Sequence, residues 1–143
     1  MLGKIASVAI VRPGRLEIAW DDGHVASIDL ADTIEARPAL ARLRDPAEFA
    51  RAHVSDDGWS LEWPCGVDFG AAQLRRWADE QAGEIMPPAL FRAWMEKHKL
   101  TQEQAAQALG LSRRMIAYYL SGEKPIPKTV MLATEGYAAR CMA

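Results

Sequence analysis

The sequence predicts two domains of different fold class: a small α+β domain of antiparallel sheet and short helices, followed by an all-α domain. Three observations support this division. Apolar and polar residues alternate early in the chain, which is the period of a strand. Beyond Pro88, apolar residues recur at helical spacing, and Pro87-Pro88 interrupts the chain between the two patterns. The charge also changes sign at this point. We therefore expect domains at residues 1–84 and 88–143.

Three strands open the first domain. Residues 4–11 are apolar with β-branched members, 15–20 alternate, and 25–30 resume the alternation. Pro13-Gly14 and Asp22-Gly23 are turn signals between them. This spacing predicts a three-stranded antiparallel sheet.

Short helices and one more strand complete the first domain. Proline favours the first position of a helix, which predicts helices over residues 38–43 and 46–52. Alternation over residues 59–63 predicts a strand, and helical spacing predicts a helix over 71–80. The chain has five tryptophans, which we place in the cores; the alternative is an aromatic platform for nucleic acid. They are Trp20, Trp59, Trp63, Trp77 and Trp94.

The second domain is expected to begin and end with a helix. The first spans residues 88–99 and the last residues 127–142. The predicted core side of the first helix consists of Ala89, Leu90, Ala93, Trp94 and Met95. The last helix carries Val130, Met131, Ala133 and Tyr137.

Residues 100–126 predict two short helices joined by a tight turn. Thr101 can cap the first helix and Ser112 the second, because a side-chain oxygen accepts from a free backbone N–H there. Gly110 lies between them and can adopt the left-handed conformation that ends a helix. A connection this short suits two crossed helices.

The second of these helices has an apolar arc and a polar arc. The inward arc consists of Met115, Ile116, Tyr119 and Leu120. The outward arc consists of Arg113, Arg114, Ala117, Tyr118 and Ser121. Arginine pairs with guanine edges and with phosphate, so this arrangement is typical of a helix that enters the DNA major groove. The alternative is a packing module whose arginines only face solvent.

The charge distribution favours the DNA interpretation. Residues 1–87 carry 9 Lys and Arg against 15 Asp and Glu, a charge of −6, whereas residues 88–143 carry 8 against 4, a charge of +4. A local basic surplus supplies non-specific affinity for phosphates. Chance clustering of charge is the alternative.

The second domain resembles the phage-repressor-like (Xre-type) helix-turn-helix family over roughly residues 88–137. The matching string is Leu100-Thr101-Gln102-Glu103, Ala106, Leu109-Gly110, Ser112-Arg113-Arg114, Ile116 and Ser121-Gly122. The resemblance implies a lambda-repressor-like fold, with Gln102, Arg113, Arg114, Met115 and Tyr118 at the usual DNA-facing positions. Leu120, Ala105 and Tyr118 depart from the residues common in the family.

The first domain resembles a small bacterial domain family of unknown function, found alone or fused to a helix-turn-helix, in some cases beside toxin-like genes. The matching residues are Leu16, Asp22-Gly23, Ile28-Asp29-Leu30, Leu43-Arg44-Asp45-Pro46, Phe49, Gly58, Leu61-Glu62-Trp63-Pro64 and Val67-Asp68-Phe69. This resemblance implies a small α+β fold and little about activity.

Nothing in the sequence predicts an enzyme or a cofactor. Cys65 and Cys141 match no metal spacing and are expected to be free thiols, Cys141 exposed. An acidic metal site among Asp21, Asp22, Asp29 and Asp32, or a Cys65–histidine pair, is a weaker alternative. No secretory pattern or membrane span is recognised, so a cytoplasmic protein is expected.

We therefore expect a sequence-specific binder of double-stranded DNA, a homodimer acting as a transcriptional regulator. The predicted base contacts are Arg113, Arg114, Met115 and Tyr118. The predicted phosphate contacts are Gln102, Ser112, Lys124 and Lys128. The alternative is an antitoxin-like protein in which residues 1–84 bind a partner protein, with DNA binding for autoregulation. An enzyme that binds a small ligand in the first domain is the poorer third hypothesis.

Overall fold

The computed structural model describes residues 3–142, and the chain divides into two compact units, Met1–Gln81 and Ala82–Ala143. Both units match the predicted fold classes: unit 1 combines antiparallel sheets with short helices, and unit 2 is mainly helical. Within residues 3–142, no helix has the length and apolar character needed to cross a membrane.

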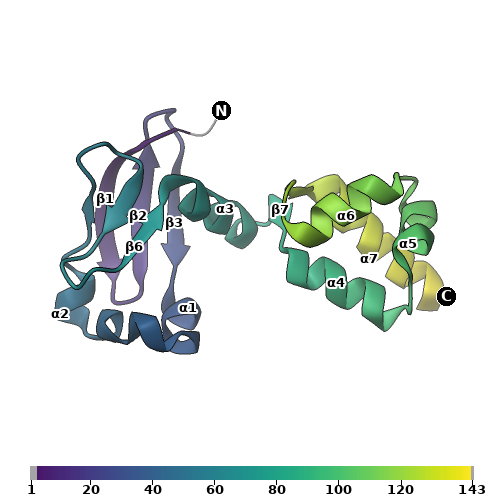
Figure 1. The fold of residues 1–143 in the computed structure, drawn as a ribbon, viewed down its shortest axis with the longest axis horizontal. Helices are drawn as coiled ribbons and strands as arrows, with labels where there is room; N and C mark the ends of the chain where they lie inside the picture. The colour runs from purple at the N-terminus through teal and green to yellow at the C-terminus, as the bar shows by residue number, and fades with distance from the viewer. Residues whose placement is uncertain (1–2, 143) are drawn as a thin grey trace. The chain divides into compact units, whose positions relative to one another are not determined.

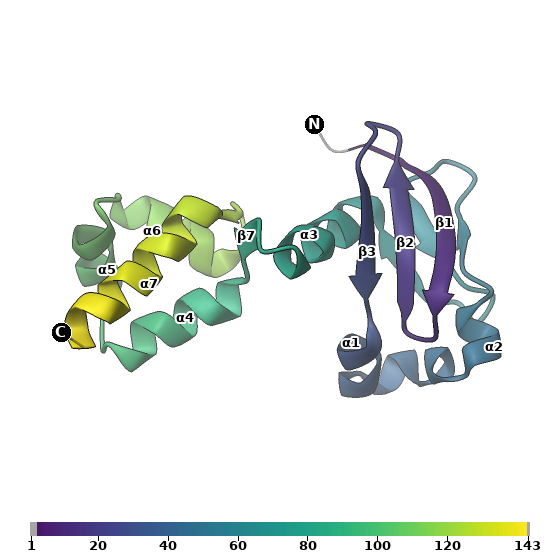
Figure 2. The ribbon, with the colours of Figure 1, turned by 180° about the vertical axis from the view of Figure 1, so that it is seen from behind.

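Unit 1 is built on two small antiparallel sheets. The first has the order β1 (Ile5–Arg12), β2 (Arg15–Trp20) and β3 (Val25–Asp29), which confirms the predicted three-stranded sheet. The second consists of β4 (His53–Val54), β5 (Ser60–Glu62) and β6 (Asp68–Gly70). Figures 1 and 2 show the first sheet from its two sides. The sequence predicted β5 and missed β4 and β6, which are too short to show a period.

Four helical segments accompany the sheets. They are α1 (Ala31–Ala36), the 3₁₀ helix η1 (Pro38–Arg44), α2 (Pro46–Phe49) and α3 (Ala71–Gln81). Each predicted proline start is confirmed, because Pro38 and Pro46 open η1 and α2. Asp45 caps α2 by accepting the Ala47 N–H at 3.1 Å. The sequence missed α1, whose N-cap residue, Leu30, has no side-chain oxygen to cap the helix.

The core of unit 1 lies between the sheets and the helices. Its fully buried large side chains include Leu16, Ile18, Ile28, Phe49, Leu61 and Leu74. The Trp63 indole N–H donates to the Phe49 carbonyl at 2.9 Å, so this buried polar group is satisfied.

Trp59 corrects the prediction that every tryptophan is a core residue. Its side chain is 49% exposed, it precedes β5, and the Lys4 ammonium lies 5.4 Å from its ring centroid. The predicted strand over residues 59–63 began one residue too early, because the strand geometry starts only at Ser60.

Unit 2 consists of four helices closed by a short strand pair. The helices are α4 (Pro88–Lys97), α5 (Gln102–Leu109), α6 (Arg113–Ser121) and α7 (Lys128–Met142). The strands β7 (Ile85–Met86) and β8 (Ile126–Pro127) pair with each other and were not predicted. This pairing joins the segment before α4 to the segment between α6 and α7.

The buried face of α4 agrees only in part with the predicted one. Trp94 and Met95 are buried as predicted, whereas Ala89, Leu90 and Ala93 are exposed and Phe91, which was not predicted, is buried. Both sets fit helical spacing, so periodicity did not decide between them. Packing did, because the Phe91 ring lies 5.5 Å from Trp94 and 5.8 Å from Tyr119, and burying the larger aromatic surface is more favourable.

Candidate nucleic-acid interface

The start of α5 is fixed by a reciprocal cap. The Thr101 hydroxyl accepts the Gln104 N–H at 3.1 Å, and the Gln104 side-chain oxygen accepts the Thr101 N–H at 2.9 Å. Two backbone donors that a helix start would leave unpaired are therefore satisfied. This confirms the predicted cap at Thr101 and places Gln102 at the first position of α5, half-buried.

The turn between α5 and α6 adopts the predicted geometry. Gly110 has φ 70° and ends α5, and a Cβ there would meet no atom within 4 Å. The glycine is therefore required by its backbone angle and not by lack of space. Ser112 then caps α6 by accepting the Met115 N–H at 3.1 Å. These two residues set where α6 begins relative to α5.

The inner side of α6 anchors it in unit 2. Ile116 and Tyr119 are buried, and they pack in the same cluster as Ala105 and Ala106 of α5. The small alanine side chains allow the two helices to approach closely. Burial raises the pKa of Tyr119, so its hydroxyl stays protonated. The predicted inward arc of α6 is thus confirmed.

The outer side of α6 presents the predicted cations to solvent. Arg113, Arg114, Ala117 and Ser121 are exposed, and Tyr118 is half-buried. Met115, also predicted to contact bases, is half-buried and packs against the helical core, so only part of its side chain is presented.

The positions of Arg113 and Arg114 are unfavourable for helix stability. Both lie in the first turn of α6, which contains no acidic residue. The backbone N–H groups give that end a partial positive charge, and a cation there costs roughly 0.3–1 kcal/mol. Helix stability therefore does not explain these arginines, whereas the same positive end favours a phosphate.

The cations of the two units also differ in their partners. Within residues 3–142 every ion pair joins side chains of unit 1, such as Arg75 and Asp22 at 3.0 Å. Among the described residues, no carboxylate lies within ion-pair distance of a cation of unit 2. The net positive charge of that unit, +3 from 8 Lys and Arg against 5 Asp and Glu, is thus available to an external anion.

Lys124 and Lys128 follow α6 and are both exposed. Lys124 lies against Tyr118, with its ammonium 4.8 Å from the ring centroid. Lys128 opens α7. The structure therefore joins Lys124 to the outer arc of α6, whereas Gln102 and Lys128 lie at the starts of other helices.

Arg92 is a supporting residue that the sequence did not identify. Its guanidinium, from α4, donates to the Leu120 carbonyl in the last turn of α6 at 3.2 Å. Carbonyls at a helix end lack intrahelical partners, and a cation there is favourable. No local sequence pattern could indicate this contact, because it joins residues 28 positions apart.

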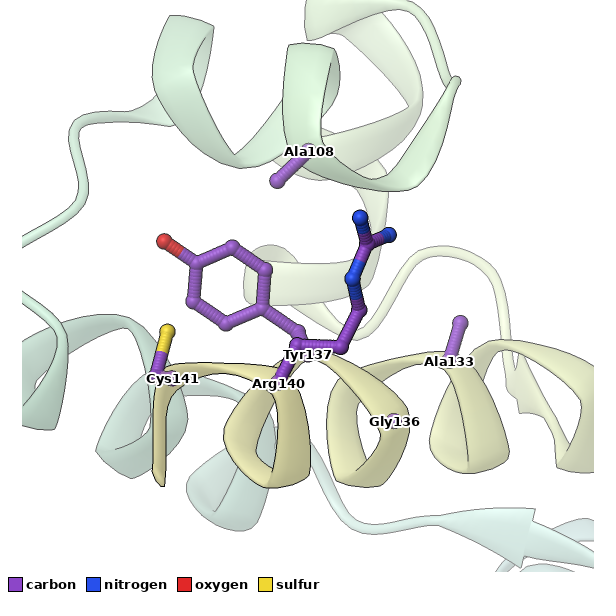
Figure 3. A pocket seen from close by; sticks show the side chains of 6 residues that line it. All are labelled: Ala108, Ala133, Gly136, Tyr137, Arg140 and Cys141. Carbon is purple, nitrogen blue, oxygen red and sulfur yellow. The ribbon is translucent and has the colours of Figure 1, made fainter. Parts of the chain in front are cut away.

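A cavity of about 690 Å³ lies between α5 and α7 and is separate from this face (Figure 3). Its lining consists of Ala108, Ala133, Gly136, Tyr137, Arg140 and Cys141. Burial, and then the adjacent Cys141 thiol, raises the pKa of Tyr137. The cavity lies beside the last turns of α7, where the partial negative charge of the helix carbonyls disfavours a bound anion.

The described residues show no metal centre. No group of three or more metal-ligating side chains occurs among residues 3–142. Cys65 and Cys141 are free thiols, and Cys141 is exposed as predicted.

This combination of a small α+β unit and a capped, crossed pair of helices in a helical unit defines a helix-turn-helix protein. The family described as "Protein of unknown function (DUF2442)" matches residues 5–80, and the family described as "Helix-turn-helix" matches residues 91–133. The chain therefore belongs to the DUF2442 family and carries a helix-turn-helix domain. Both resemblances inferred from the sequence are confirmed.

A solved structure is similar to this chain over nearly its whole length. It is the crystal structure of "Putative DNA Binding Protein NE0471" from Nitrosomonas europaea ATCC 19718, which is 39% identical. The similarity covers 95% of this chain and 86% of the other, with a TM-score of 0.56. A comparison with curated proteins gave no match.

Proposed function

We propose that unit 2 binds double-stranded DNA sequence-specifically and that the protein is a cytoplasmic transcriptional regulator. The observation that carries this proposal is the placement of Arg113 and Arg114. They are exposed at the positive end of α6, without an ion-pair partner among the described residues. The helix-turn-helix match and the name of the similar crystal structure support DNA as the ligand.

The residues divide into two roles in this proposal. Arg113 and Arg114 contact base edges in the major groove, with Met115 and Tyr118 beside them. Gln102, Ser112, Lys124 and Lys128 contact phosphates, which fix register and carry no sequence information. No catalytic residue or cofactor is assigned.

A homodimer fits this mode of binding. One helix-turn-helix unit reads only a few base pairs, so affinity and specificity require two. We expect two half-sites whose centres lie about 34 Å apart, one turn of B-DNA.

Selection of bound sequences from a random duplex library tests the proposal. The full-length protein should enrich one motif, and the Arg113→Ala/Arg114→Ala double variant should not. Arg140→Ala is the matched control, because Arg140 is an exposed arginine of the same unit at the opposite end of a helix. Failure of the wild-type protein to bind any duplex at low salt would exclude the proposal.

A second function for unit 1 is favoured by its charge of −5, from 9 Lys and Arg against 14 Asp and Glu, and by the exposed Trp59. An acidic surface with an exposed tryptophan suits a basic partner protein, because tryptophan is frequent among residues that dominate binding energy. The protein would then be antitoxin-like, with DNA binding for autoregulation.

The test of this second function is co-expression with the product of the adjacent gene. Full-length protein should relieve growth inhibition by that product, and Trp59→Ala should relieve it less. If the adjacent product is not toxic, or if wild type and variant protect equally, this role for Trp59 is wrong.

A further inference from the structure

The segment after α6 folds back onto Tyr118. Gly122 ends the helix with φ 80°, and the Lys124 N–H then donates to the Tyr118 carbonyl at 3.4 Å. The Lys124 side chain places its ammonium 4.8 Å from the Tyr118 ring centroid. Lys124 therefore contacts Tyr118 through both its backbone and its side chain.

Two further hydrogen bonds hold this turn in place. The Ser121 hydroxyl donates to the Tyr118 carbonyl at 3.1 Å and accepts the Glu123 N–H at 3.3 Å. The backbone between Tyr118 and Lys124 is thus restrained at three points. A lysine on a free loop would sample many orientations, whereas this one is directed to a single aromatic ring.

The position of the ammonium limits how Tyr118 can meet DNA. A cation over an aromatic face is attracted by the ring quadrupole. The Lys124 ammonium occupies one face of the ring, so a base cannot stack on that face. The ring edge and the hydroxyl remain for contacts in the major groove, where an apolar edge suits the methyl group of thymine.

We propose that Lys124 is a positioning residue that acts through Tyr118, so that the two residues set one base preference together. The proposal rests on DNA binding by α6. It changes the role of Lys124 from a phosphate contact, which would be indifferent to sequence, to a determinant of specificity. The preferred base at the position facing Tyr118 is thymine.

A double-mutant cycle measures this coupling. The affinity of the full-length protein is compared for the selected duplex and for one with the thymine at that position replaced. Lys124→Ala and Tyr118→Leu should each reduce the affinity ratio about two- to fivefold, the equivalent of roughly 0.5–1 kcal/mol for an exposed cation–π pair. The double variant should lose no more than Tyr118→Leu.

Conservative variants separate the ring from the hydroxyl. Tyr118→Phe and Lys124→Arg retain an aromatic face and a cation, so both should keep the preference. Loss of the preference in Tyr118→Phe would overturn the assignment to the ring. If Lys124→Ala weakens binding equally on both duplexes and lowers the salt dependence, Lys124 is a phosphate contact and the inference is wrong.

A measurement without DNA separates this inference from the proposed function. The Tyr118 ring current should shift the Lys124 side-chain methylene resonances upfield in the free protein, and Tyr118→Leu should abolish the shift. Absence of the shift in the wild type overturns the inference even if DNA binding is confirmed. Presence of the shift in a protein that binds no duplex contradicts the proposed function and leaves the contact intact.

Discussion

The side chain of Gln81 pairs with the backbone of Asp29 in both directions. Its oxygen accepts the Asp29 N–H and its nitrogen donates to the Asp29 carbonyl, each at 2.8 Å. Asp29 is the last residue of the edge strand β3, so Gln81 supplies the two bonds that a neighbouring strand would make. The last residue of α3 is thereby fixed to the sheet.

Gln81→Leu is expected to destabilise unit 1. Both hydrogen bonds are lost, and at about 0.5–1.5 kcal/mol each the free energy of unfolding should fall by roughly 1–2 kcal/mol. Urea unfolding followed through the amide resonances of unit 1 measures the change. Gln73→Leu, an exposed glutamine of the same helix, is the control and should have little effect. Equal losses in both variants would show that the pairing contributes nothing specific.

Thr101→Ala is expected to destabilise unit 2 by about 1 kcal/mol, because the cap of α5 is removed. Urea unfolding followed through the amide resonances of unit 2 measures this change in the free energy of unfolding. Thr129→Ala changes an exposed threonine in the first turn of α7 and should leave stability unchanged or slightly raised. An unchanged unfolding midpoint for Thr101→Ala would contradict the importance of the reciprocal cap.

Lys99→Gly is expected to stabilise unit 2. Lys99 has φ 54°, a left-handed conformation that costs a side chain roughly 1–2 kcal/mol and costs glycine little. Because glycine also loses more entropy on folding, the net gain should be about 0.5–1 kcal/mol. Lys97→Gly, in the last turn of α4, should instead destabilise the unit. A destabilised Lys99→Gly variant would indicate that this backbone angle is not strained.

Replacing Arg113 or Arg114 should lower the affinity for DNA without lowering the stability of unit 2. Replacing either by alanine should cost about 1–3 kcal/mol of binding and relax the sequence preference. Arg113→Glu should abolish binding yet raise the unfolding free energy by roughly 0.3–1 kcal/mol, because a carboxylate suits the first turn of α6. Fluorescence anisotropy and thermal unfolding measure the two quantities. A destabilised Arg113→Glu variant would mean that the arginine has a structural partner.

The stability of unit 1 should fall at acid pH in part through Asp22. The His24 backbone N–H, and then the Arg75 guanidinium, hold the pKa of Asp22 below its ordinary value of 3.8. Since the folded-state pKa is the lower one, the stabilisation is complete above the unfolded value and is lost as pH falls through the folded value. Asp22→Asn should weaken this acid dependence, and Asp56→Asn, at an exposed aspartate, should not. Identical pH profiles for wild type and Asp22→Asn would contradict the assignment.

Local patterns in the sequence predicted the parts of the site that depend on neighbouring residues. Thr101, Gly110 and Ser112 act on backbone groups within a few positions, so their roles follow from residue type and spacing. The exposure of Arg113 and Arg114 likewise follows from the phase of one amphipathic helix.

Contacts between distant segments could not be predicted in this way. Periodicity offered two faces for α4, and only docking against Tyr119 selected the one that contains Phe91. The pairing of β7 with β8 joins segments about 40 residues apart, and each is too short to show a strand period. The hydrogen bond from Arg92 of α4 to α6 and the exposure of Trp59 could not be predicted for the same reason.

The sequence by itself determined the two fold classes, the sign of charge in each half and the caps and turn of the helix-turn-helix, because these depend on composition and on short-range backbone chemistry. Tertiary structure decided which face of α4 is buried, which cations have partners, and that Lys124 lies on Tyr118. Those outcomes depend on side chains brought together by packing. Because Lys124 lies on Tyr118, we expect these two residues to set one base preference together.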